Sequence, residues 1–281
     1  MPKNSRLAFG LICLSLTACN DNIIDLDDEQ LASVYQDNII DLNGEQLVSV
    51  YQDDQAISCE NTGAISVKTH GKLLIDENVE LHCSQKGHDG MGYTQACGSQ
   101  TGTINIFTIH DKDLATAESL GFSELSTLPD AQFDAQCEFN VISDTRKNDL
   151  LKQLNDQYVI WQANNTSNYQ FQFNMSFSDC PTFAPTPIVT ISVIDNAINT
   201  VYYIDDETFL SNITDYKTID ELYSELDLKL KLMPIEAGFN ANKPFESPVF
   251  SSMGIPEQYF INGGGEECDA ANYTISDLVL L

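Results

Sequence analysis

Residues 169–177 read YQFQFNMSF, and this stretch indicates the fold class of the second half of the chain. Its aromatic and Met side chains recur at every second position with polar residues between them, which is the pattern of a half-buried β-strand. Two further apolar runs, 188–194 and 198–204, flank Asp195 and Asn196, residue types that tolerate the positive φ of a tight hairpin. The pattern therefore predicts an antiparallel sheet with one buried face.

Two helical patterns accompany these strands. Apolar side chains lie at helical spacing between Leu150 and Trp161. A second helix is predicted after Thr218, which has the spacing of a capping box with Glu221. Further strands are expected at 245–250, 258–261 and 273–280. We therefore expect residues 146–281 to form an α+β domain, in which an antiparallel sheet carries two helices on one face.

The preceding region, residues 55–139, alternates strand and helix signals. Its strongest strand is TINIFTI, residues 103–109, which is apolar on both faces as a central strand should be. Helices are expected at 66–75 and, capped by Asp111 or Asp113, up to Leu120 before Gly121, with weaker strands at 56–60, 78–83 and 133–139. The order βαββαβ predicts a small αβ sandwich of the ferredoxin-like type.

A tandem duplication precedes this region. Residues 21–36, DNIIDLDDEQLASVYQ, recur at 37–52 as DNIIDLNGEQLVSVYQ, and the pair Asn43 and Gln46 in the second copy has capping-box spacing. Each predicted helix has only about nine residues, which is marginal in isolation, and two copies are too few for a solenoid. We predict that residues 19–54 are a spacer carrying this repeat.

The first 18 residues have the parts of a secretion signal. A short cationic start is followed by the apolar run 7–16, which is too short to span the ~30 Å hydrocarbon core as a helix. The signal ends in Leu16-Thr17-Ala18-Cys19 and resembles the lipobox of bacterial lipoproteins, whose Cys is acylated and becomes the first residue. The alternatives are an ordinary signal peptide with an incidental Cys, or a buried apolar helix.

The position after Cys19 is Asn20 rather than the Asp that resembles an inner-membrane retention mark. We therefore predict that a lipid (palmitate) on Cys19 anchors the chain in the outer membrane, facing the periplasm. No second apolar run approaches 18 residues, so this lipid is the expected link to the membrane.

The mature chain would have 281 − 18 = 263 residues and a formal net charge of 11 − 42 = −31. Charge this negative disfavours nucleic acid and anionic lipid as partners, because phosphate binding needs clustered Lys and Arg. It favours attraction of cations or basic partners. The partner that we expect is an envelope protein or ligand that the sequence does not identify.

The cysteines divide into three groups. Cys13 leaves with the signal and Cys19 carries the lipid, so six remain, an even number that in an oxidising periplasm predicts disulfides. A polar joint at 140–148 separates four of the six from the other two. If each domain closes its own bridges, Cys180 pairs with Cys268. The remaining four, Cys59, Cys83, Cys97 and Cys137, allow three connectivities.

One group of residues offers an alternative use of cysteine. His82, Cys83, His88 and Cys97 supply imidazole and thiolate ligands of the kind that transition metals take. Their spacing is not that of a zinc knuckle, and both cysteines can be used in disulfides, so a bridge is favoured over the metal site. The lone histidines His70 and His110 are predicted to be surface or cap residues.

Motifs for catalysis are absent from the sequence. It contains no Gly-x-Ser-x-Gly elbow, no His-Glu-x-x-His helix and no Cys-x-x-Cys pair. The acidic groups at 25–29, 205–207 and 266–269 are predicted to be solvated surface, and whether they bind calcium stays open. We therefore expect a binding or accessory protein without catalytic activity or cofactor, with a metal-binding envelope protein as the alternative.

Residues from about 150 to 281 resemble the family catalogued as domain of unknown function 6174. The resemblance rests on Trp161, Tyr169-Gln170-Phe171, Cys180-Pro181, the 189–204 hairpin, residues 218–222, Gly254-Ile255-Pro256 and Tyr273-Thr274-Ile275. The chain departs from the family by closing the hairpin with Asp195-Asn196 and by the insertion-like GGGEE at 263–267. The resemblance implies a small secreted or lipid-anchored domain, and it implies no catalytic residues.

Overall fold

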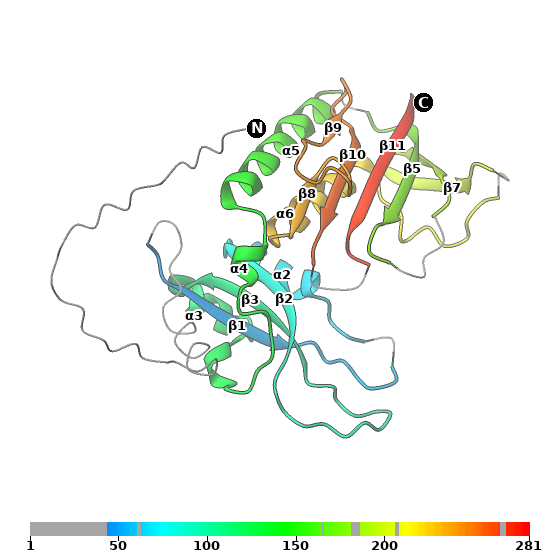
Figure 1. Ribbon diagram of the computed structural model, residues 1–281. Helices are drawn as coiled ribbons and strands as arrows, with labels where there is room; N and C mark the ends of the chain where they lie inside the picture. Colours follow the sequence, from blue (N-terminus) through cyan, green and yellow to red (C-terminus); the bar gives the residue numbers. More distant parts are fainter. Residues whose placement is uncertain (1–43, 61–62, 165, 181–185, 206–207, 265–267) are drawn as a thin grey trace, which may run out of the picture.

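The computed structural model describes residues 44–60, 63–164, 166–180, 186–205, 208–264 and 268–281 (Figure 1). They form two antiparallel sheets, one with strand order β2-β3-β1-β4 and one with order β7-β6-β5-β11-β10-β8, to which β9 is added beside β10. Each sheet has its own buried apolar cluster and its own helices. The α+β fold class is confirmed. We call the smaller unit, up to residue 140, the N-terminal domain and the rest the C-terminal domain.

The N-terminal domain is built from two split βαβ units. Its elements are β1 (Leu47–Asp53), α2 (Val67–Asp76), β2 (Leu81–His88), β3 (Thr103–His110), η1 (Asp111–Asp113), α3 (Leu114–Ser119), β4 (Ser123–Glu124), η2 (Leu125–Thr127) and α4 (Cys137–Asn140). Strand β3 is antiparallel to β1 and β2, which are therefore parallel to each other and joined through α2. Likewise β3 and β4 lie on either side of β1, are parallel to each other and are joined through α3. This is the ferredoxin-like arrangement predicted from the element order.

Local signals set the helices of this domain where the sequence predicted them. The hydroxyl of Ser66 accepts a hydrogen bond from the Thr69 N–H (3.1 Å) and begins α2, whose Leu74 is fully buried. Gly121 has φ +93° after α3, a left-handed conformation that is accessible to glycine, and Phe122 then packs into the core. Both predicted helices are confirmed, but α3 begins only at Leu114, after the turn η1, and Asp113 makes no side-chain capping hydrogen bond.

The predicted helix in the second repeat copy is wrong. Residues 47–53 form β1, which pairs with β3 over its whole length, from Leu47 opposite His110 to Asp53 opposite Ile104. The sequence LVSVYQ is rich in β-branched and aromatic residues, and its Val50 is fully buried. Long-range pairing and burial outweigh a helix that is marginal on its own. The spacer predicted at 19–54 therefore cannot include residues 47–53, and Asn43 and the first copy lie outside the described residues.

Other strand predictions in this domain need correction. At 56–60 there is one isolated bridge, between Ile57 and Gln100, and β2 runs on to residue 88 instead of ending at 83. The predicted strand at 133–139 is wrong, because its second half begins the short helix α4. Cys137 at the start of α4 is bonded to Cys83 on β2, which places this segment against the sheet rather than within it. The fourth strand is instead the two-residue β4.

The C-terminal domain follows its sequence pattern closely, except that the strand expected at 245–250 forms only at 249–250 and a strand at 236–238 was not predicted. Its elements are α5 (Asp144–Ala163), β5 (Tyr169–Phe177), β6 (Val189–Ile194), β7 (Ala197–Tyr203), α6 (Ile219–Lys231), β8 (Glu236–Gly238), β9 (Val249–Phe250), β10 (Pro256–Asn262) and β11 (Ala271–Leu280). Asp195 and Asn196 close the hairpin with φ 51° and 63°. Thr218 and Glu221 form both hydrogen bonds of a capping box. Helix α5 begins six residues before Leu150, within the predicted joint.

One face of the large sheet packs against both helices (Figure 1). On β5 the alternate residues Tyr169, Phe171 and Phe173 are buried. The Tyr169 ring meets Trp161 of α5 edge to face at 5.1 Å, and its hydroxyl accepts a hydrogen bond from the N–H of Ile219 at the start of α6 (3.2 Å). The predicted placement of two helices on one face is confirmed.

The two domains share an apolar contact. Leu232 and Met233, at the end of α6, pack into the cluster of the N-terminal domain. Helix α2 approaches closely here because Gly71 lacks a side chain, and a Cβ at this position would lie 2.3 Å from Leu232 Cδ2. The Ile142 N–H also donates to the Pro234 carbonyl (2.9 Å). The polar joint is therefore packed against the fold rather than a free linker.

Three disulfides close the cysteine pattern. Cys180 is bonded to Cys268, as predicted. Of the three connectivities left open for the other four, the structure has Cys59–Cys97 and Cys83–Cys137. In the described part of the chain, no helix combines the length and apolar character that crossing a membrane requires.

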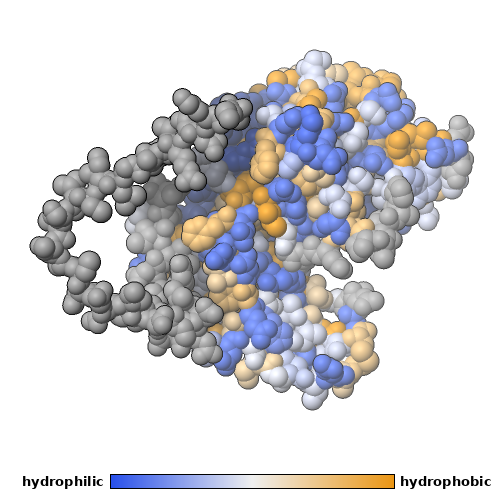
Figure 2. Space-filling model, in the orientation of Figure 1, coloured by the Kyte–Doolittle hydropathy of each residue, from blue (hydrophilic) through white to orange (hydrophobic). Residues whose placement is uncertain are grey.

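The lysines of the described residues lie close to acidic side chains. Each lysine of the described ranges lies within 4.0 Å of a carboxylate; these are Lys68, Lys72, Lys86, Lys112, Lys147, Lys152, Lys217, Lys229, Lys231 and Lys243. In the view of Figure 2, hydrophilic residues are spread over both domains with smaller apolar areas between them. The uncompensated charge of the surface is therefore carried by carboxylates.

The place of β1 in the core can be tested with two matched substitutions. Val50→Ala removes two methyl groups from a fully buried side chain of β1, and Val159→Ala makes the same change at a 59% exposed site on α5. We expect Val50→Ala to lower the free energy of unfolding by about 1–3 kcal/mol and Val159→Ala by much less, measured by urea denaturation. Equal, small effects would contradict the position of β1 inside the sheet.

Candidate functional site

Two buried histidines meet where β2 begins and β3 ends. The pairing of β2 with β3 shifts between Leu81 and Cys83, so that His82 lies in a bulge, and His110 is the last residue of β3. Bulges re-aim side chains in this way. The two side chains are 7% and 6% exposed, and their Nε2 atoms lie 3.1 Å apart with the rings nearly perpendicular. We call them the histidine pair.

Two glutamates flank the histidine pair on different sides. Glu80 Oε2 lies 4.0 Å from His110 Nε2, and Glu45 Oε2 lies 3.3 Å from His110 Nδ1. The other oxygen of Glu80 accepts a hydrogen bond from Lys147 (2.7 Å) on α5, so that the carboxylate is held between the two domains. The donor atoms of Glu80, His82 and His110 all lie within 4.8 Å of one another.

The electrostatic environment favours neutral imidazole at His82. Burial, and next the neighbouring His110, lower the pKa of His82 below its ordinary value of 6.5. Because the two Nε2 atoms face each other, one can donate a hydrogen bond only if the other presents a lone pair. Glu45 Oε2 lies 3.3 Å from His110 Nδ1, which forms no hydrogen bond within the described residues. The ring that donates across the Nε2–Nε2 contact is set by the tautomers of the two histidines.

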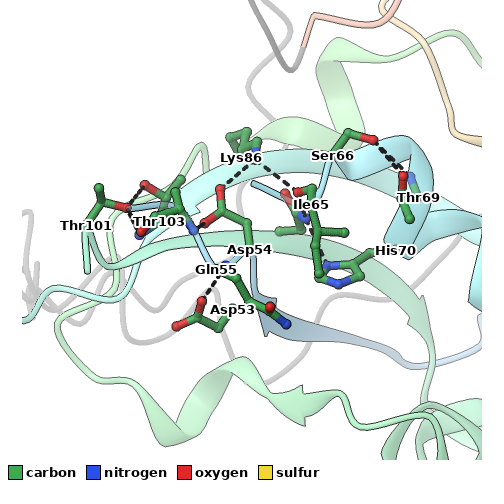
Figure 3. Close-up of polar contacts among 12 residues, drawn as sticks. Asp53, Asp54, Gln55, Ile65, Ser66, Thr69, His70, Lys86, Thr101 and Thr103 are labelled. Atoms are coloured by element: carbon green, nitrogen blue, oxygen red, sulfur yellow. Dashed lines mark hydrogen bonds and ion pairs between the residues drawn. The ribbon is translucent and has the colours of Figure 1, made fainter. Parts of the chain in front are cut away.

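A second polar cluster lies in the interior of the N-terminal domain (Figure 3). Lys86 on β2 contacts Asp54 Oδ2 at 2.7 Å, and the Asp54 side chain is only 2% exposed. Asp54 Oδ1 also accepts a hydrogen bond from the Ala56 N–H (2.9 Å). Buried charges need such partners, because the cost of their desolvation is otherwise left uncompensated. The cluster fixes the chain leaving β1.

The same network reaches helix α2. Asn105 on β3 donates both to the Ile65 carbonyl (2.8 Å) and to Nδ1 of His70 (2.9 Å), which is 3% exposed. Burial, followed by the charge of Lys86, lowers the pKa of His70. These contacts tie the connection between β1 and α2 to the central strand, and we interpret them as structural.

A cavity of about 300 Å³ lies between the two domains. Its walls include the apolar Val67, Leu232 and Ile261 and the polar Lys229 and Ser84. The Ser84 hydroxyl is buried without a hydrogen-bond partner among the described residues. Burial lowers the pKa of Lys229, which donates a hydrogen bond to the Tyr273 hydroxyl (2.7 Å). The lining also includes the charged Lys68 and Asp269, and a cavity that combines apolar walls with polar groups is typical of a small-ligand site.

The metal site proposed from sequence is wrong in its ligand set. Cys83 and Cys97 are both in disulfides, with Cys137 and Cys59, and are not free to bind metal. His88 bonds the Thr101 carbonyl through Nε2 (2.9 Å) and accepts from the Gly90 N–H. Of the four residues, His82 alone belongs to the candidate group formed by Glu80, His82 and His110.

His110 and His70 were predicted at the surface or in caps, and both are buried. The signal that could have revealed the pair is positional: the start of one strand and the end of the next meet when the two strands are antiparallel neighbours. Of the acidic groups singled out in the sequence, only Asp205 and Asp269 lie within the described residues, and Asp269 accepts a hydrogen bond from the Gly264 N–H. The acidic positions at 25–29, 206–207 and 266–267, and also Cys19, lie outside them.

Comparisons with protein-family models, with curated proteins and with solved structures found no match for this chain. The resemblance of residues 150–281 to domain of unknown function 6174 therefore stays a prediction.

The buried His70 predicts a pH dependence of stability. Since its pKa in the folded protein lies below 6.5, the unfolded chain binds a proton that the folded chain does not, and the free energy of unfolding falls as the pH drops through 6.5. We expect His70→Gln to reduce this fall between about pH 8 and about pH 5, measured by urea denaturation. The half-exposed His88→Gln is the control. A pH profile unchanged by His70→Gln would contradict the prediction.

Proposed function

We propose that this protein is a lipid-anchored binding or accessory protein of the cell envelope, held in the outer membrane by Cys19 and facing the periplasm, without catalytic activity of its own. The observation that carries the proposal is the pairing of all six cysteines after Cys19 in three disulfides. Disulfides form and persist in oxidising compartments, so the pairing supports the export that the signal sequence predicts.

The membrane link is argued from the signal itself. The run that ends in Leu-Thr-Ala-Cys places Cys19 at the position where a lipobox cysteine is acylated. A single acyl chain binds membranes only marginally, so a stable anchor requires more than one chain on this residue or a second membrane contact. The strongly negative charge of the mature chain opposes a contact with anionic lipid, which leaves acylation as the device that we propose.

The binding role is supported by the cavity between the domains. Its size and mostly apolar walls suit a small ligand, and Lys229 and Ser84 supply polar groups that could orient it. Because α2 and α6 both line this cavity, its shape depends on the contact between the domains. A basic protein of the envelope is the partner that the acidic surface favours.

The anchor is tested by Cys19→Ser in cells grown with labelled palmitate. We expect the variant to lose the label and to move from the membrane fraction to the soluble periplasmic fraction, because acylation is the proposed membrane device. Cys13→Ser, six residues earlier in the apolar run, is the matched control and should leave both properties unchanged. Membrane association of Cys19→Ser at the wild-type level would rule out the anchor.

A further inference from the structure

The histidine pair has the donor atoms of a divalent metal site. Two imidazole nitrogens and a carboxylate oxygen converge at one edge of the N-terminal sheet, from Glu80, His82 and His110. We propose that these three residues bind a divalent transition-metal ion of the zinc type, with His110 oriented by Glu45. The proposal goes beyond the role of an accessory protein, because it assigns a ligand to the N-terminal domain, and it does not depend on the lipid anchor.

The spacing of the two nitrogens fits such an ion. In a tetrahedral zinc site with Zn–N bonds of about 2.0–2.1 Å, two imidazole nitrogens lie about 3.3 Å apart. In the histidine pair the two Nε2 atoms lie 3.1 Å apart. Glu80 Oε2 is 4.0 Å from His110 Nε2, and the Glu80 side chain is 52% exposed, so it has room to close the remaining distance.

The protonation of the pair also suits a metal. Binding of a metal through both Nε2 atoms requires each ring to carry its proton on Nδ1 and to present the Nε2 lone pair to the ion. A neutral ring reaches this state by moving its proton from Nε2 to Nδ1, with no proton released. Ligand histidines in zinc sites usually donate their other N–H to a carboxylate, and Glu45 Oε2, 3.3 Å from His110 Nδ1, lies close enough to take this place when the metal is bound.

The surrounding charges orient the Glu80 carboxylate. Lys147 is 5% exposed at its side chain and binds both Glu80 Oε1 (2.7 Å) and Asp144 (2.9 Å), which leaves Glu80 Oε2 directed toward the histidines. The positive charge of Lys147 is thus balanced by two carboxylates. Three protein ligands leave a fourth position for water or another ligand, and the half-exposed Glu80 and Glu45 give an ion access from solvent.

The donor set indicates which metals fit. Two imidazoles with one carboxylate suit zinc, nickel or copper, whereas magnesium and calcium prefer sites made of oxygen ligands. A net charge of −31 on the mature chain raises the local concentration of cations in general, so selectivity must come from the imidazoles. This makes the two histidines the residues on which the test depends.

The test is titration of the full mature chain, purified in detergent and stripped with a chelator, with zinc chloride in a calorimeter. We expect one equivalent to bind and to raise the melting temperature. His110→Ala should abolish this binding, and Glu80→Gln should weaken it at least tenfold. Glu45→Gln should weaken it about tenfold to a hundredfold, the range found for outer contacts of ligand histidines. His88→Ala is the matched control and should bind as the wild type does.

Two features keep the result interpretable. Glu80→Gln and Glu45→Gln change half-exposed side chains, so they test the site even where replacing a buried histidine impairs folding. Magnesium chloride titrated in place of zinc should give no saturable binding that depends on His110. The proposal is overturned if the wild type does not bind zinc, or if His110→Ala and Glu80→Gln both bind zinc as tightly as the wild type does. The histidine pair is then a hydrogen-bonded structural contact.

The outcome can be separated from that of the anchor. Cys19→Ser should bind zinc with wild-type affinity, because Cys19 contributes no ligand to the site. A variant released from the membrane that still binds zinc supports both proposals. Loss of zinc binding in His110→Ala with normal membrane association supports the metal site independently of the anchor.

Discussion

The insertion of Leu232 and Met233 into the core of the N-terminal domain is the contact on which the arrangement of the molecule depends. Met233 is 3% exposed, and burying a side chain of this size contributes about 1.5–3 kcal/mol. The contact exists because Gly71 lets α2 approach the end of α6. It brings Val67 of α2 and Lys229 of α6 to the two sides of one cavity. Apolar packing of the end of α6 against α2 thus sets the relative position of the domains, and the joint at 140–148 connects them in that position.

The histidine pair depends on the same arrangement. Its potential ligands all come from the N-terminal domain, yet the lysine that orients Glu80 lies on α5 of the C-terminal domain. A change in the angle between the domains would move Lys147 away from Glu80 without touching either histidine. The chemistry of the site and the packing at the junction are therefore coupled through one ion pair, whereas the buried pair of Asp54 and Lys86 serves a single domain.

The parts of the fold that the sequence predicted are those that local interactions decide. The hairpin at Asp195-Asn196, the capping box of Thr218 and the stop at Gly121 each depend on a few adjacent residues. The missed parts depend on partners far along the chain. LVSVYQ has a helix-like start signal before it, but its pairing with β3 decides its conformation. His82 and His110 are separated by 28 positions and meet only through the register of β2 on β3. Cys180 and Cys268 were predicted because two cysteines allow one pairing, whereas four allow three.

With the proposed lipid on Cys19, the start of β1 at Leu47 would also limit how far the folded part can lie from the bilayer. From Cys19 to Gln46 there are 46 − 18 = 28 residues, and at about 3.5 Å per residue no conformation of them spans more than about 100 Å. A spacer ending at residue 54 would have allowed about 125 Å. Glu45, which contacts both His110 and Lys112, lies two residues before β1, where residues 19–46 join the fold. With the lipid on Cys19, the histidine pair would thus be at the attached end of the molecule. Any partner that binds there would have to do so within about 100 Å of the bilayer.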